Sequence, residues 1–349
     1  MIPLHLLTDN GFKFISDLKN SEVYNSNFKL KSINYINSFD SFYFPCYKVI
    51  LSTGLTFTCR STQIFKGLIF KPEEIKNELD HELISLYNPE DYIFTSFPKK
   101  NIVKEHFCIE NIEILNSLKS SFYLENFNIN NIDNNSINKL KNLPINVKVS
   151  SDFYKFLALS LIRGKIKNIY DDINCISYKF NKNKINHERM KLTLIRFFDA
   201  CGLNYEIREY DKYYYINYID STLTNYVDSL LKEDYNRYNN LFNSEYQNSF
   251  ILYLYIMTNN TFYMSIKSFL FFKSLAYNNN LVLIASKNPI KSNHKFSLVT
   301  RLQSESKENY KEIPDVIFLK DGYLTKIESL ELISKQGDSD YLPEYLLVC

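Results

Sequence analysis

The spacing of apolar positions changes near residue 150, and this change divides the chain. Before residue 100, short runs of β-branched and aromatic residues dominate. Residues 43–51 and 55–59 flank a Ser-Thr-Gly turn signal and predict a β-hairpin. Residues 73–86 have a more helical pattern. Residues 126–142 are rich in Asn and Ile, which predicts a weakly structured connection.

After residue 150 the pattern predicts the order helix, one or two strands, helix, hairpin, helix. Ser150 or Ser151 can cap a first helix that ends at Gly164. The other predicted elements of this block are a strand at 175–180, a helix at 187–200, strands at 205–209 and 213–218, and a helix at 222–232. A similar order follows, with helices at 248–257 and 267–277 and strands at 262–266, 281–286 and 296–301. We interpret the two blocks as a diverged internal repeat. Short strands are expected again at 316–319, 324–327 and 345–348.

Composition limits the classes of function. The chain has 349 residues, which suits two or three domains, and its 41 Lys plus Arg nearly balance its 39 Asp plus Glu. Any surface for nucleic acid must therefore be local. The six cysteines are scattered and form no C-x-x-C pair, so a zinc site has little support. With no signal peptide and no apolar run as long as a membrane span, we expect an intracellular, reducing compartment and no membrane partner.

Two apolar helices carry a resemblance to a known family. Residues 156–166 read FLALSLIRGKI, and residues 250–259 read FILYLYIMTN. Both resemble the signature helix of LAGLIDADG homing endonucleases. In that family a metal-binding Asp stands just before a glycine at the end of each helix, and the strands of both repeats lie in the major groove of DNA. Here the two Asp positions hold Arg163 and Thr258.

The flanking segments resemble Hint domains, the splicing domains of inteins. Three stretches carry this likeness: LHLLTDNGFKFISDL at 4–18, GLTFTCRSTQ at 54–63 and GYLTKIESL at 322–330. The combined resemblance implies an α+β fold, in which a discontinuous β-rich Hint-like domain holds an inserted pseudo-twofold αββαββα repeat domain. The implied parts are Hint-like at 1–100, a connection at 101–149, repeats at 150–235 and 236–312, and Hint-like again at 313–349.

The residues that would perform the family's chemistry are replaced. The His of the second Hint block, which would donate a proton to the scissile amide, corresponds to Gln63, and the splicing nucleophile and the terminal His-Asn pair are missing. We therefore expect no splicing. Neither Arg163 nor Thr258 is a charged ligand for a hard cation, so we expect no catalytic residue, no metal site and no cofactor. Mg²⁺ would be needed only if the chain were an active endonuclease.

Binding of double-stranded DNA could remain without cleavage. Basic side chains in both repeats would contact phosphates, and a cation at Arg163 and Lys165 could replace the lost metal electrostatically. The expected DNA-binding residues are Arg163, Lys165, Lys167, Lys182, Lys184, Lys287, Lys291, Lys295 and Arg301. The plain alternative is that these are solvated lysines.

Two other functions stay open at this point. One is a domesticated structural or interaction subunit of a larger assembly, such as a viral one, whose partners are proteins. The other is an active endonuclease with relocated acids, for which Asp152, Asp171 and Asp172 are nearby candidates.

Overall fold

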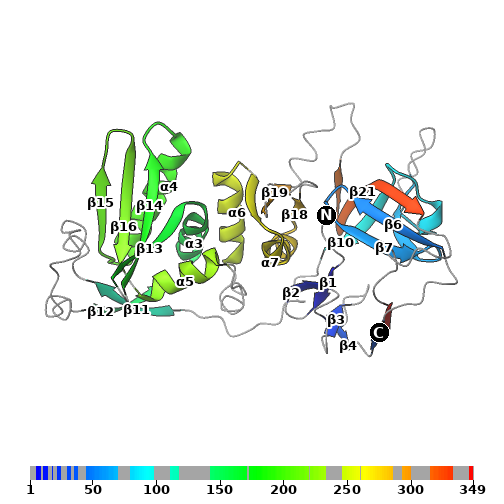
Figure 1. Ribbon diagram of the computed structural model, residues 1–349, viewed down its shortest axis with the longest axis horizontal. Coiled ribbons are helices and arrows are strands. Elements are labelled where there is room, and N and C mark those ends of the chain that lie inside the picture. Colours follow the sequence, from blue (N-terminus) through cyan, green and yellow to red (C-terminus); the bar gives the residue numbers. More distant parts are fainter. Residues whose placement is uncertain are drawn as a thin grey trace. The chain divides into compact units, whose positions relative to one another are not determined.

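A computed structural model gives the fold of the chain (Figure 1). It describes residues 5–8, 11–14, 18, 22–24, 30–32, 35–37, 45–69, 79–97, 111–117, 142–170, 173–219, 221–232, 246–259, 261–285, 293–299, 315–332 and 346–348. The chain forms two compact units. Residues 105–260 make up the inserted unit, and residues 1–104 together with 261–349 make up the discontinuous unit. The architecture is a sheet-rich mixture of helices and strands, which confirms the α+β class.

The inserted unit is built on a four-stranded antiparallel sheet in the order β13-β14-β16-β15, drawn in green in Figure 1. Its strands are β13 (Gly164–Tyr170), β14 (Ile173–Asn181), β15 (Tyr205–Glu209) and β16 (Tyr213–Ile219). Three helices contact this sheet or one another: α3 (Ser151–Arg163), α4 (Ile185–Ala200) and α5 (Ser221–Leu231). A separate ribbon pairs β11 (Asn111–Ser117) with β12 (Asn142–Lys148).

Side chains alternate between the two faces of this sheet, and one face is the core. The core face carries Tyr178 and Tyr218, which are fully buried. Phe198 of α4 stacks on Tyr218 with ring centroids 4.9 Å apart. The hydroxyl groups of Ser160 on α3 and Tyr178 lie 2.7 Å apart. Helices α3 and α4 are thereby fixed against the core face.

The two apolar helices of the sequence analysis lie side by side in the inserted unit. Helix α6 (Gln247–Met257) contacts α3 along its length, and Figure 1 draws the two next to each other. Near the start of both helices the hydroxyl groups of Ser151 and Ser249 are 2.9 Å apart. The two helices therefore meet, although they come from segments about a hundred residues apart.

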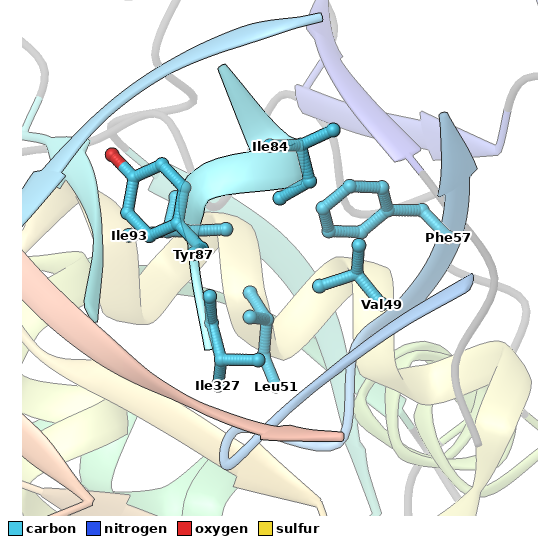
Figure 2. Packing of buried hydrophobic residues seen from close by; sticks show 7 residues of the cluster. All are labelled: Val49, Leu51, Phe57, Ile84, Tyr87, Ile93 and Ile327. Atoms are coloured by element: carbon cyan, nitrogen blue, oxygen red, sulfur yellow. The ribbon is translucent and has the colours of Figure 1, made fainter. Parts of the chain in front are cut away.

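The discontinuous unit contains the large sheet β7-β6-β21-β10-β8-β9, with β20 paired to β21. These strands are β6 (Cys46–Leu51), β7 (Thr56–Arg60), β8 (Ile64–Leu68), β9 (Asp80–Leu83), β10 (Tyr92–Ser96), β20 (Val316–Leu319) and β21 (Gly322–Leu332). A 3-10 turn, η2 (Ile84–Leu86), follows β9. Figure 2 shows the apolar cluster on this sheet, formed by Val49, Leu51, Phe57, Ile84, Tyr87, Ile93 and Ile327. Ile327 comes from the far end of the chain, so the first and last segments share one core.

Shorter elements complete the discontinuous unit. One small sheet has the order β2-β1-β3-β4, and β5 pairs with β22. Their bounds are β1 (His5–Thr8), β2 (Gly11–Phe14), β3 (Glu22–Tyr24), β4 (Leu30–Ser32), β5 (Tyr35–Asn37) and β22 (Leu346–Val348). A third sheet, β17-β19-β18, accompanies helix α7. Its elements are β17 (Thr261–Ser265), α7 (Ile266–Asn278), β18 (Val282–Ala285) and β19 (Asn293–Val299).

The elements after α6 are joined to the N-terminal segment by hydrogen bonds. The amide of Ala285 donates to the carbonyl of Thr53 at 3.1 Å. The amide of Phe12 donates to the hydroxyl of Ser274 at 3.0 Å, and the Tyr277 hydroxyl donates to the Ser96 carbonyl. The expected second repeat is consequently divided between the two units at residue 260. The expected boundaries at 150, 236 and 313 remain predictions.

Most predicted elements of the region 150–299 have the predicted type, whereas the prediction for residues 73–86 differs from the structure. The helical pattern at 73–86 is wrong for its described part, because residues 80–83 pair with β8 as a strand and only one 3-10 turn follows. The sequence predicted one or two strands between the first two helices of this block, and the structure has two, β13 and β14. The predicted connection at 126–142 lies outside the described residues except for Asn142, which begins β12.

Candidate nucleic-acid interface

The face of the four-stranded sheet opposite the core is lined by basic and aromatic side chains. Lys165 and Lys167 on β13 and Lys179 on β14 are exposed. The strand register places Lys179 beside Tyr215 of β16, which in turn lies beside Arg208 of β15. Residues that pair across antiparallel strands point to the same side, so these residues share one face. We call this surface the cationic face, formed by Lys165, Lys167, Lys179, Arg208, Tyr213 and Tyr215.

Tyrosine rings hold the lysines of the cationic face along the sheet. The Lys179 Nζ atom lies 3.8 Å from the ring centroid of Tyr213 and 5.5 Å from that of Tyr215. The Lys167 Nζ atom lies 5.8 Å from the Tyr215 centroid. Each such contact contributes about 0.5–1 kcal/mol at an exposed site. The ammonium groups are thus positioned above the strands while remaining accessible to an anion.

Negative charge on this face is small. Glu206 of β15 is its described acid, and its Oε1 atom accepts a hydrogen bond from Arg208 Nε at 2.9 Å. None of the three lysines forms an ion pair with any residue that the structure describes. Between the basic side chains lie small buried groups, among them Ser177 and Cys175. The described residues of this face therefore present an excess of positive charge.

Arg163 ends helix α3 and lies beside His187 of α4. The Arg163 Nη2 and His187 Nε2 atoms are 2.5 Å apart. Burial lowers the pKa of Arg163, and it lowers the pKa of His187 together with the charges of Arg163 and Lys184. The Arg163 Nε atom is buried and has no hydrogen-bond partner in the described part of the chain. No sequence motif singles out His187 as a site residue.

Thr258 and Asn259 end helix α6 in a different way. The Thr258 hydroxyl donates to the Leu254 carbonyl at 2.7 Å, so its proton is used within its own helix. Asn259, the second residue after α6, has a φ of 52°, the left-handed conformation that ends many helices. Gly164, the residue directly after α3, is extended, and a Cβ there would lie 2.5 Å from the Ser160 carbonyl oxygen. The two helix ends thus differ in backbone geometry.

The remaining expected contact residues lie in several places. Lys182 forms an ion pair with Glu209 at 2.6 Å, and Lys184 is exposed just before α4. Lys295 is exposed on β19 of the discontinuous unit. Lys287, Lys291 and Arg301 lie outside the described residues. Gln63 is exposed after β7. Its amide donates to the Arg60 carbonyl, and its carbonyl accepts from the Ile84 amide.

Three further observations concern metal, thiol and membrane chemistry. Among the described residues, no group of three or more His, Cys, Asp or Glu side chains could hold a metal ion. The cysteines among the described residues, Cys46, Cys59, Cys175 and Cys201, form no disulfide bond. Burial raises the pKa of Cys175 to about 11, although it lies on the cationic face. The helices in the described part are all too short or too polar to span a bilayer.

Comparison with known proteins gives structural similarities only. No protein-family model and no curated protein matches the chain. Crystal structures of I-DmoI in complex with DNA are similar: the complex with Mn is 14% identical over 45% of this chain and 93% of the other, with a TM-score of 0.32. The complex with Ca is 16% identical over 45% and 87%, with a TM-score of 0.34. Structures of mesophilic variants of the homing endonuclease I-DmoI are 12% identical over 46% and 95%, with a TM-score of 0.34.

Proposed function

We propose that this chain binds double-stranded DNA through the cationic face and does not cleave it. The observation that carries the proposal is the row of exposed lysines on neighbouring strands, which no described acid neutralises. Contacts between basic side chains and phosphates supply most of the affinity in sequence-independent binding. The proposed ligand follows from this, because a duplex offers phosphates in regular rows.

The shape of the cationic face also supports a duplex as the ligand. Lys165 and Lys167 are two residues apart on β13, which separates them by about 7 Å along the strand. Lys179 lies on β14, the adjacent strand, which runs about 5 Å from β13; Lys179 is two residues beyond Ser177, the partner of Lys165, and so about 7 Å further along the strand. A two-stranded ribbon of this kind enters the major groove of B-DNA, which is about 12 Å wide. Tyr213 and Tyr215 add hydroxyl groups that can bond phosphate oxygens.

The ends of α3 and α6 support the absence of cleavage. Metal-dependent phosphodiester hydrolysis requires acidic ligands that hold divalent cations at the scissile phosphate. The two positions where the resemblance would place them hold a guanidinium, Arg163, and a hydroxyl bound within its helix, Thr258. A cation at Arg163 repels Mg²⁺. We therefore propose that the cutting chemistry has been lost while the binding surface has been kept.

The discontinuous unit supports an intein-like layout. Its first and last segments share the core around Ile327, and the inserted unit interrupts them, as expected for a Hint-like domain that carries an insertion. Gln63 cannot act as the acid or base that a His would supply at that position. We propose that this part of the chain is a support and performs no splicing.

The test has two arms that use the full chain. Fluorescence anisotropy with a labelled duplex, repeated across a salt series, should give a log Kd that rises steeply and linearly with log salt concentration. Incubation of a supercoiled plasmid with Mg²⁺ or Mn²⁺ should leave it intact. No binding at low salt would refute the proposal. Nicking by the wild-type protein at least as fast as by the Arg163→Asp, Thr258→Asp double variant would mean that relocated acids support an active endonuclease.

A structural role without DNA is the second candidate. The observation that favours it is the way in which the elements after α6 are joined to the N-terminal segment, through Ala285 and Thr53 and through Tyr277 and Ser96. In this role both units would serve as supports in a larger protein assembly. Duplex binding that is absent at low salt, together with co-purification in a stoichiometric protein complex, would favour this second candidate.

A further inference from the structure

Hydrogen-bond donors exceed acceptors where helix α3 ends. Arg163 Nη2 points at His187 Nε2 from 2.5 Å, and the amide of Asn181 donates to His187 Nδ1 at 2.8 Å. Two N–H donors therefore aim at one imidazole ring. A neutral imidazole has one lone pair and one N–H, so it can accept from only one of them.

The backbone decides which nitrogen carries the proton. The Asn181 amide is always a donor, and it requires the lone pair at Nδ1. The proton is then on Nε2, where it faces the guanidinium, which is also a donor. The imidazole stays neutral, because burial and the neighbouring charges of Arg163 and Lys184 lower the pKa of His187. His187 Nε2–H and Arg163 Nη2–H thus converge without an acceptor between them.

Among the described residues, the surroundings add further donors and no available acid. Arg163 Nε is buried without a partner, and Arg163 forms no ion pair with any described residue. His187 is 7% exposed and belongs to the first turn of α4, whose Ile185 and Asn186 amides have no described acceptor. A helix N-terminus carries a partial positive charge.

The nearby acids are engaged elsewhere. Glu188 bonds Lys191 at 2.6 Å, and Glu209 bonds Lys182 at 2.6 Å. Lys184, which precedes α4, is exposed and forms no ion pair with a described residue. The end of α3 and the start of α4 therefore carry positive charge that no described acid compensates.

We propose that Arg163 and His187 form an oxyanion site that binds a phosphate group, with one phosphate oxygen accepting from both side chains. The guanidinium is at the end of a flexible side chain, so it can move far enough to admit an oxygen at about 2.8 Å from each nitrogen. The assignment of this phosphate to the DNA backbone rests on the proposed function. In that case, the cation that replaces the family's acid contributes directly to DNA binding.

The binding arm compares two variants of equal charge in the full-length protein. Arg163→Met should lower the slope of log Kd against log salt by about 0.9, the effect of one phosphate contact. Arg196→Met removes an exposed arginine further along α4 and should leave the slope unchanged. His187→Phe should weaken binding several-fold at every salt concentration without a change of slope, because a neutral donor displaces no counterion. Circular dichroism should confirm that all three variants fold.

The second arm uses inorganic phosphate and nuclear magnetic resonance. The wild-type spectrum should show His187 as the Nε2–H tautomer, and phosphate should shift the Arg163 Nε–H and His187 Nε2 signals. Equal salt slopes for Arg163→Met and Arg196→Met, with no shift on adding phosphate, would overturn the site. If phosphate shifts these two protein signals but the protein does not bind duplex DNA, the oxyanion site is supported and the proposed function is refuted. If phosphate shifts the Arg163 and His187 signals while Arg163→Met leaves the salt slope of DNA binding unchanged, the site binds a free phosphate and not the DNA backbone.

Discussion

Removal of two charges from the cationic face should reduce the salt dependence of DNA binding by a calculable amount. The change is the double variant Lys165→Met, Lys167→Met. Methionine keeps an apolar chain of similar length over the Tyr215 ring, so the packing along the sheet is preserved while the charge is lost. Neither lysine pairs with a described acid, so no carboxylate is left unpaired by the change.

The magnitude follows from counterion release. Each phosphate contact contributes about 0.9 to the slope of log Kd against log salt, so two contacts contribute about 1.8. Between about 50 and 200 mM salt, the affinity of the wild type should therefore fall about 12-fold more than that of the double variant. Fluorescence anisotropy with a labelled duplex at four or more salt concentrations measures both slopes.

The matched control is Arg189→Met, Arg196→Met. Both arginines are exposed on α4, which packs on the core face of the same sheet through Phe198. The control removes the same net charge from the same unit on the opposite side. Its slope should equal that of the wild type. Equal reductions in the two double variants would mean that DNA senses only net charge, and the assignment to the cationic face would be refuted.

Three changes test other parts of the structure. Gly164→Ala should lower the free energy of unfolding by about 1–3 kcal/mol in urea denaturation, because its Cβ would lie 2.5 Å from the Ser160 carbonyl oxygen; an unchanged midpoint would contradict the close approach. Asn259→Ala should destabilise by about 1 kcal/mol and Asn259→Gly should not, because the φ of 52° disfavours a Cβ-bearing residue without a short polar side chain; equal stabilities would refute this. Burial lowers the pKa of Lys273, whose Nζ lies 4.5 Å from the Phe12 ring centroid, from 10.5 to about 7. The unfolded chain keeps this proton to higher pH, so stability should rise between pH 7 and 9.5 by at most about 1.4 kcal/mol per pH unit, and Lys273→Met should remove this rise.

Local patterns predicted the elements of the inserted unit well. Helix α3 has the predicted start near Ser150 and the predicted end at Gly164. Strands β15 and β16 and helix α4 lie within one or two residues of their predicted ranges. Helix α4 shows the reason, because its apolar positions Met190, Leu194 and Phe197 are all buried on one side. Residues 80–83 form a strand instead of the predicted helix because β8 offers a pairing partner.

The charged positions were visible in the sequence, but their use was not. Lys165, Lys167 and Lys179 could be named as basic residues, whereas the addition of Arg208 and Tyr215 to the same face required the strand register. Lys182 has the same side-chain chemistry, but Glu209 neutralises it across a distance of 27 residues. Charge alone therefore cannot separate a binding lysine from a paired one.

The sequence by itself determined the types of local structure and the presence of Arg163 and Thr258, which are not acids, at the ends of the two apolar helices, because periodicity and residue identity are properties of short segments. The tertiary structure decided which groups meet. It placed His187 against Arg163 from 24 positions away and joined the elements after α6 to the N-terminal segment. Such contacts depend on the packing of separate elements into a common core, and no pattern within one segment encodes the partner.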